Sequence, residues 1–134
     1  MEPAFEATTS GITVRVSVTY LDEHSNPFTG PFLWAYYITI INIGTKTVQL
    51  LRRSWEITDS TGRTLCVQGD GVVGEQPVLR PGMQFSYSSS TQLGTPTGFM
   101  VGTYHMQTLP EATPFDISVP AFSLDSPYQD TQRH

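Results

Sequence analysis

Hydrophobic and polar residues alternate one by one along several stretches of the chain, most clearly over residues 12–20. The apolar residues at every second position there are Ile12, Val14, Val16, Val18 and Tyr20. Because successive side chains of a β-strand point to opposite faces, this period of two predicts a strand with one buried face. Phe115, Ile117 and Val119 alternate in the same way with Asp116 and Ser118, which predicts a strand over residues 115–122, near the other end of the chain.

Residues 32–43 are rich in aromatic and β-branched side chains and are apolar on both faces of the predicted strand. The two faces carry, respectively, Trp34, Tyr36, Ile38 and Ile40, and Tyr37, Ile41 and Ile43. A strand that is apolar on both sides belongs in the middle of a sheet. We therefore expect a central strand with one face toward an opposing sheet.

A pair of strands joined by a tight turn is predicted between residues 48 and 68. One side of the first strand, residues 48–58, is expected to hold Leu51, Arg53, Trp55 and Ile57. Of these, Trp55 and Ile57 are expected in the core. The acid and the glycine of residues 59–62 are typical of a tight turn, after which residues 63–68 return antiparallel.

The remaining strands are expected at residues 84–90, 99–106 and 115–122, with a short extended piece at residues 78–79. About seven strands with no helical period indicate an all-β fold, an immunoglobulin-like (fibronectin type III-like) antiparallel β-sandwich. We expect a single domain over residues 5–124 and a polar, disordered tail over residues 125–134.

Charge and composition exclude several classes of function. The formal net charge is -5, and Lys46 is the only lysine, which argues against an electrostatic grip on nucleic acid. The first residues lack the basic and apolar runs of a secretory signal, and no segment reaches the roughly 20 apolar residues that span a membrane. We expect a cytoplasmic protein that uses neither nucleic acid nor membrane as a partner.

Cys66 is the only cysteine, so no internal disulfide can form, which fits a reducing compartment. Its neighbours in the sequence are apolar and no base is adjacent. We expect a semi-buried small residue rather than a reactive thiolate.

Three glycines, Gly69, Gly71 and Gly74, have the spacing of a dinucleotide-binding motif. That motif requires a helix beginning at the third glycine, so that its free N–H groups meet the pyrophosphate. Here Pro77 and Pro81 follow and would break such a helix within about two turns. The motif therefore predicts a loop between two strands.

Two interpretations of this loop stay open. Consecutive backbone N–H groups can form a concave nest for an anion, and a magnesium-bound phosphate would tolerate the nearby carboxylates of Asp70 and Glu75. Alternatively, the glycines supply positive φ angles between the strands. The basic pair Arg52 and Arg53, with Arg63 near it across the hairpin, could meet one carboxylate or phosphate, or be solvated edge charges.

The sequence offers little catalytic or metal-binding chemistry. His24, His105 and His134 lie far apart and in no recognised metal-ligand spacing. A hydrolase needs a base and a nucleophile within hydrogen-bond reach, and no such pair is apparent, since His105 is expected to lie on a sheet face. We expect no cofactor, no metal site and no enzymatic activity.

Five segments in this order resemble the ApaG family, small bacterial proteins whose domain also occurs fused in larger eukaryotic proteins. They are residues 34–40, 48–59, 69–77, 79–82 and 95–100. The resemblance covers roughly residues 5–124; Cys66 and Gly94 depart from the family pattern. It implies a fibronectin type III-like sandwich, an association with cobalt resistance and magnesium efflux, and a partner-binding role in the eukaryotic fusions.

Our first functional hypothesis is a non-catalytic module that binds an unidentified protein through its loops or an edge strand. The alternative is a sensor of a magnesium-bound phosphate or nucleotide at the glycine loop. The oligomeric state stays open. The residues expected to bind are Gly69, Asp70, Gly71, Gly74, Glu75, Gln76, Phe99 and Met100.

Overall fold

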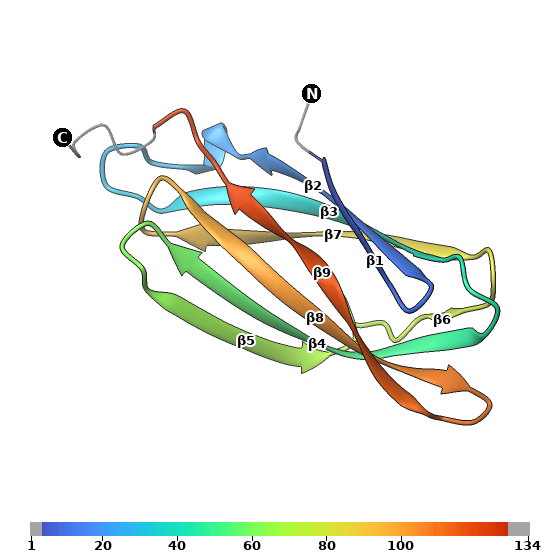
Figure 1. Cartoon of the computed structure of the whole chain (residues 1–134). Helices are drawn as coiled ribbons and strands as arrows, with labels where there is room; N and C mark the ends of the chain where they lie inside the picture. The colour runs from blue at the N-terminus through green and yellow to red at the C-terminus, as the bar shows by residue number, and fades with distance from the viewer. Residues whose placement is uncertain (1–3, 129–134) are drawn as a thin grey trace.

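Two antiparallel sheets pack face to face in the computed structural model, which describes residues 4–128 (Figure 1). The first sheet has the strand order β1-β2-β3-β7, and the second has the order β5-β4-β8-β9, with β6 paired to β4. The strands are β1 (Ala4–Thr9), β2 (Ile12–Tyr20), β3 (Phe32–Asn42), β4 (Thr47–Asp59), β5 (Thr64–Asp70), β6 (Val78–Leu79), β7 (Gln84–Leu93), β8 (Gly98–Leu109) and β9 (Pro114–Leu124). A single 3-10 turn, η1 (Asp22–His24), lies between β2 and β3.

The predicted all-β sandwich is confirmed, and the short extended piece expected at residues 78–79 forms the two-residue strand β6. The structure adds one strand that was not expected, β1, in which small and polar side chains hide the alternation and which has no buried residue. Pairing with β2 holds β1 in place.

The core lies between the inner faces of the two sheets, where the alternating residues of β2 and β3 meet those of β8 and β9. The largest fully buried side chains include Trp34, Tyr104, Phe122, Ile38, Ile40 and Leu50. The prediction for β3 is confirmed: Trp34 and Ile40 are completely buried and Tyr37 on the other face is exposed. Burial of such side chains contributes roughly 1.5–3 kcal/mol each to stability.

A β-bulge in β4 changes which residues point inward. Pairing with β8 shifts register between Leu50 and Arg52, so Leu51 has no partner there. Leu50 is buried before the bulge, and Trp55 and Ile57 are buried after it. A bulge inserts one extra residue and so reverses the alternation. The expectation that Trp55 and Ile57 are core is confirmed, whereas Leu50, assigned from the pattern to the opposite side, is also core.

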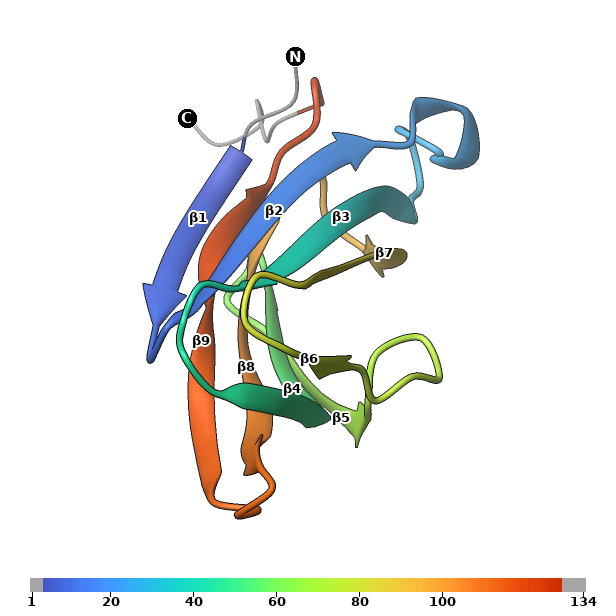
Figure 2. The same cartoon turned by 90° about the vertical axis from the view of Figure 1, so that its right-hand side faces the viewer.

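The sandwich is closed along one side and open along the other. On the closed side β1 contacts β9, which brings edge strands of both sheets together. On the open side lie β7 and β5, the edge strands of the two sheets, and Figure 2 shows the sheets diverging there. Within residues 4–128, β5 and β7 each pair with only one neighbouring strand.

The exposure of one residue differs from the expectation, and part of the expected tail lies within the described residues. Cys66 is exposed, not semi-buried, because it lies on the outer face of edge strand β5, opposite Glu56. The first part of the expected tail makes contacts: the Trp34 indole donates to the Asp125 carbonyl at 2.8 Å, and Ser126 donates to the Pro96 carbonyl at 2.7 Å. The rest of that tail, from residue 129, lies outside the described residues, as does His134.

Gly102 on β8 is expected to be irreplaceable, because a Cβ there would lie 2.5 Å from ring carbons of Trp55. Trp55 packs against Tyr36, Tyr104 and Phe122, so its ring cannot move aside without disturbing the core. We expect Gly102→Ala to lower the free energy of unfolding by about 2 kcal/mol, measured by urea denaturation.

Gly94→Ala is the matched control, since a Cβ at Gly94 meets nothing within 4 Å. It should leave the free energy of unfolding unchanged or slightly raised. Equal effects of the two substitutions would contradict the packing of Trp55 on the Gly102 backbone.

Candidate binding cleft

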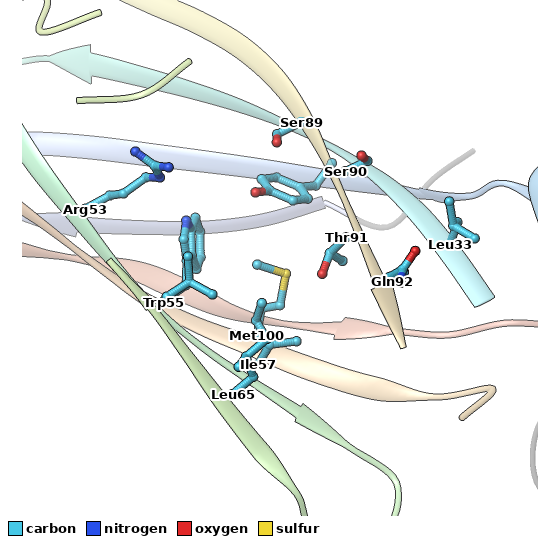
Figure 3. A pocket seen from close by; sticks show the side chains of 12 residues that line it. Leu33, Arg53, Trp55, Ile57, Leu65, Ser89, Ser90, Thr91, Gln92 and Met100 are labelled. Carbon is cyan, nitrogen blue, oxygen red and sulfur yellow. The ribbon is translucent and has the colours of Figure 1, made fainter. Parts of the chain in front are cut away.

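A cleft of about 430 Å³ opens between the two sheets on the side of β5 and β7 (Figure 3). Side chains from both sheets line it, with apolar residues mainly on the side of β4 and β5 and small polar residues on β7. The lining consists of Leu33, Tyr36, Arg53, Trp55, Ile57, Leu65, Val67, Ser89, Ser90, Thr91, Gln92 and Met100. The cleft is therefore an extension of the core to the surface.

The sequence of β7 explains why the core is left open here. Alternation along this strand turns Phe85 and Tyr87 toward the core, and both are packed against it. The next positions of the same face, Ser89 and Thr91, are small and polar. Side chains of this size do not span the distance of about 10 Å between packed sheets. Leu65 of β5 consequently remains 63% exposed.

Arg53 is the only charged residue among the described side chains that line the cleft. Its Nη1 donates to the backbone carbonyls of Gly71, at 2.8 Å, and Asp70, at 3.1 Å. Gly69, opposite Arg53 on β5, makes room for this side chain, because a Cβ there would lie 2.8 Å from Nη1. One guanidinium thus connects the wall of the cleft to the glycine loop.

Trp55 forms the inner end of the cleft. The residue is only 3% exposed, and its ring packs edge-on against Tyr36, Tyr104 and Phe122 at centroid distances of 5.8–6.3 Å. Its Nε1 is buried and finds no acceptor among the described residues. A buried donor left without a partner costs about 1–3 kcal/mol, so it needs an explanation.

Two hydrogen-bonded tyrosines, the buried Tyr104 and the half-buried Tyr87, lie behind this wall. The hydroxyls of Tyr87 and Tyr104 hydrogen-bond across the two sheets at 2.5 Å. Burial raises the pKa of Tyr87 and holds the pKa of Tyr104 well above its usual range, where the neighbouring Tyr87 adds to the effect. Both phenols therefore stay neutral and bring no negative charge near Arg53.

The glycine loop is a tight reversal fixed to β4. Val72 and Glu75 exchange backbone hydrogen bonds of 2.8 and 2.9 Å, and the two residues between them, Val73 and Gly74, both have positive φ angles. The Gly71 amide donates to the carbonyl of the bulged Leu51 at 2.8 Å. No helix begins here, as the prolines predict.

This geometry reduces the number of donors that an anion could use. The amides of Gly71, Val72 and Glu75 donate to backbone carbonyls of the chain itself. The side chain of Gln76 is also engaged, since its Nε2 donates to the Leu51 carbonyl at 2.9 Å. Gly71 and Gly74 have φ angles of 61° and 81°, as expected from the conformational interpretation of the glycines.

The structure separates the residues that the sequence grouped as binding candidates. Gly69 and Asp70 belong to β5, and Glu75 and Gln76 are exposed on the loop beyond it. Phe99 is 46% exposed but pairs with Thr58, at the far end of β4 from the loop. Met100 was expected at the surface and this is wrong: it is 1% exposed, because alternation along β8 turns it inward, where it forms the floor of the cleft.

The arginine cluster is also only partly as expected. Arg52 and Arg53 lie opposite Asp70 and Gly69, beside a second, polar hollow of about 360 Å³ on the outer face of the sheet. Arg63 is not near them. It lies in the hairpin turn, where its backbone carbonyl accepts from the Asp59 amide, roughly 20 Å along the strand at about 3.3 Å per residue.

A hydrogen-bonded chain of serine, histidine and aspartate crosses the outer face of the second sheet. Ser54 Oγ lies 2.7 Å from His105 Nε2, and His105 Nδ1 lies 2.9 Å from Asp116 Oδ1. The expectation that no base and nucleophile lie within reach is therefore wrong. His105 lies on a sheet face, as expected. Its neighbours Ser54 and Asp116 are set by the register of β4, β8 and β9, which the sequence alone does not reveal.

Within residues 4–128, the groups around this network do not complete an acyl-transfer site. An oxyanion hole needs preorganised donors that no other group uses. β4 and β8 are paired on both sides, so their backbone amides are taken up by the sheet. Asp116 is also largely exposed, which leaves the network open to water. We interpret it as a cross-strand polar network.

Residues 4–128 contain no cluster of three or more His, Cys, Asp or Glu side chains able to hold a metal ion. Over the same residues, no helix has the length and apolar character needed to cross a bilayer.

Comparison with known proteins identifies the family. The family model described as "ApaG domain" (DUF525) matches residues 22–108. The chain belongs to the ApaG family. It is 54% identical over 125 residues to protein ApaG of Paramagnetospirillum magneticum, covering 93% of this chain and 95% of that protein. Protein ApaG of Parvibaculum lavamentivorans is 48% identical, with coverage of 97% and 99%.

Solved structures agree with this membership. A crystal structure of an ApaA protein from Bordetella pertussis superposes with a TM-score of 0.83 at 40% identity, covering 87% of this chain and 94% of that one. The C-terminal domain of wzt gives a TM-score of 0.54 at 11% identity, over 91% of this chain and 77% of that one, which shows a shared sandwich fold. The resemblance to the ApaG family is therefore confirmed.

The glycine loop of this ApaG-family chain permits a matched test of its conformation. Gly71 and Gly74 both have positive φ, but a Cβ at Gly71 would collide with the Glu75 carbonyl, whereas a Cβ at Gly74 meets nothing within 4 Å. We expect Gly74→Ala to lower the free energy of unfolding by about 1 kcal/mol and Gly71→Ala by about 3 kcal/mol or more. Urea denaturation measures both, and equal losses would contradict the hairpin-like reversal.

The tyrosine pair predicts a loss of stability at alkaline pH. The folded pKa values are raised, so unfolded phenols release protons above about pH 10 while folded ones do not. The free energy of unfolding should fall there by about 1.4 kcal/mol per pH unit per tyrosine. Tyr87→Phe should cost about 1 kcal/mol at neutral pH but make the alkaline fall shallower.

Urea denaturation at about pH 7, 10 and 11 gives these free energies. Tyr37→Phe is the control, because Tyr37 is exposed on the face of β3 that points away from the core and lies outside the tyrosine pair. It should leave the slope unchanged. A slope that Tyr87→Phe does not alter would mean that the buried pair is ionised in the folded protein.

Proposed function

We propose that this ApaG-family chain is a non-catalytic protein-interaction module whose cleft between β5 and β7 receives an extended segment of a partner protein. One observation carries the proposal: an apolar cleft opens to solvent between two strand edges that, within residues 4–128, are unpaired on that side. The chemistry of the cleft favours binding over catalysis, since no nucleophile and base face it together.

The strand edges supply backbone recognition. An unpaired edge exposes N–H and C=O groups that an extended peptide can bond by adding a strand to the sheet. The free edges of β5 and β7 face the same cleft from opposite sheets. A segment paired to one edge would direct every second side chain into the space between them.

The apolar lining supplies the remaining affinity. Leu65 and Val67 project from β5 beside Ile57 and Met100, and the cleft has room for a few side chains. Covering Leu65 would contribute free energy at roughly 25 cal/mol for each Å² of apolar surface removed from water. Such a surface is costly to leave exposed unless something binds it.

The alternative function, sensing a magnesium-bound phosphate at the glycine loop, has less support. Three of the loop amides and the Gln76 side chain are engaged within the chain. We therefore assign Glu75 and Gln76 to the rim of the protein-binding surface, and place Phe99 outside it. On this proposal, an association with cobalt resistance and magnesium efflux arises through the bound partner, in the cytoplasm.

Site-directed photo-crosslinking tests the proposal. A photoreactive amino acid at position 65, introduced in the native cell, should form crosslinks to an extended, mainly apolar segment of another protein, identified by mass spectrometry. A second crosslinker position, 67, allows Leu65 itself to be changed. With the photoreactive amino acid at position 67, Leu65→Asp should reduce capture of that partner at least about tenfold relative to the chain that keeps Leu65, which corresponds to a loss of roughly 1.4 kcal/mol in binding free energy.

Position 43 is the matched control, because Ile43 is 62% exposed but lies at the turn after β3, outside the cleft lining. Ile43→Asp should leave capture unchanged, and a crosslinker at position 43 should not recover the same segment. Capture that depends on Glu75→Lys but not on Leu65→Asp would move the site to the glycine loop. Crosslinks from position 65 to a second copy of the chain alone would contradict a separate partner.

A further inference from the structure

The buried indole of Trp55 lacks a hydrogen-bond acceptor at the inner end of the cleft. Its Nε1 has no partner among the described residues, although the residue is only 3% exposed. The second tryptophan provides the contrast, since Trp34 Nε1 donates to the Asp125 carbonyl at 2.8 Å. Of the two indoles in this chain, the one that lines the cleft is the one left unsatisfied.

The only charge in the lining is positive. The whole chain has 12 acids and 7 bases, yet the described residues around the cleft include Arg53 and no carboxylate. Figure 3 shows the nitrogen edge of the Trp55 ring turned toward the Arg53 side chain. The Trp55 N–H and the Arg53 guanidinium therefore lie on the same side of the cleft, whose other lining residues are mostly apolar or carry hydroxyl groups.

We propose that the cleft recognises a carboxylate on an apolar, extended segment of the partner, with the carboxylate held between Arg53 and the Trp55 N–H. This inference rests on the proposed function and specifies the chemistry of the segment. A carboxylate accepts both donors at once, and charge-assisted hydrogen bonds are stronger than neutral ones.

The groups nearest to this position permit such binding. Arg53 uses Nη1 to hold the carbonyls of Asp70 and Gly71, which fixes the guanidinium in place. Tyr87 and Tyr104 stay neutral and bonded to each other. Because Trp55 Nε1 is buried, the side chain that covers it must move before a carboxylate oxygen can reach it.

A pair of small probes separates the carboxylate from the apolar group. Isocaproate and isocaproamide share a branched apolar tail and differ in the acid or amide at its end. Each is added to the full chain at about neutral pH, up to about 20 mM, while proton–nitrogen correlation spectra follow the two indole N–H signals. The signals are assigned with Trp34→Phe.

We expect isocaproate to shift the Trp55 indole signal and to leave the Trp34 signal in place. The amide should bind at least about tenfold more weakly. Trp55→Phe, which keeps a ring but removes the donor, should weaken binding of the acid, followed by the backbone signals of β5 and β7, while Arg53 still favours the acid over the amide. This variant avoids Arg53, whose replacement would also release the glycine loop.

The outcomes separate the failure of this inference from failure of the proposed function. Equal binding of acid and amide, with backbone shifts confined to β5 and β7, would overturn carboxylate recognition and leave the apolar cleft as the binding site. No shift of the Trp55 signal by isocaproate would also overturn it. Crosslinking from position 65 then decides the proposed function independently.

Discussion

The β-bulge at Leu51 is the constraint on which the fold and the cleft both depend. It reverses the alternation of β4, so that Leu50 closes one end of the core and Trp55 and Ile57 build the other. It also leaves the Leu51 carbonyl free to accept from the Gly71 amide and from the Gln76 side chain. Without the extra residue, Trp55 would point to solvent, and the glycine loop would lose its anchor.

The glycine loop and the cleft are therefore parts of one arrangement. Arg53 follows the bulge, lines the cleft and holds the carbonyls of Asp70 and Gly71. Gly69 provides the space for its guanidinium, and Gly71 the close approach of the Glu75 carbonyl. The spacing of the three glycines resembles a nucleotide-binding motif, but the packing of the chain accounts for it. Gly69 makes room for Arg53, and Gly71 and Gly74 permit the tight reversal of the loop.

The sequence predicted the sandwich because period-two burial acts locally, and β2 and β3 display it along their whole length, whereas β9 changes phase after Val119. It could not predict β1, which has few apolar residues, or the bulge, which a straight count of alternate positions passes over. Met100 was grouped with its exposed neighbour Phe99 as a binding residue, whereas the alternation along β8 turns it inward. Features that depend on register across strands, such as Ser54 beside His105, need the assembled sheet.

The cleft itself was hidden from the sequence for a related reason. Its walls come from β3, β4, β5, β7 and β8, and its opening arises where Ser89 and Thr91 replace the larger Phe85 and Tyr87 along one face. In isolation that change looks like a polar strand end. Opposite Leu65 and Trp55, the same small residues leave apolar surface uncovered beside two strand edges that are free within residues 4–128. The proposed partner segment follows from this combination, because an extended chain could pair with an edge and cover the surface.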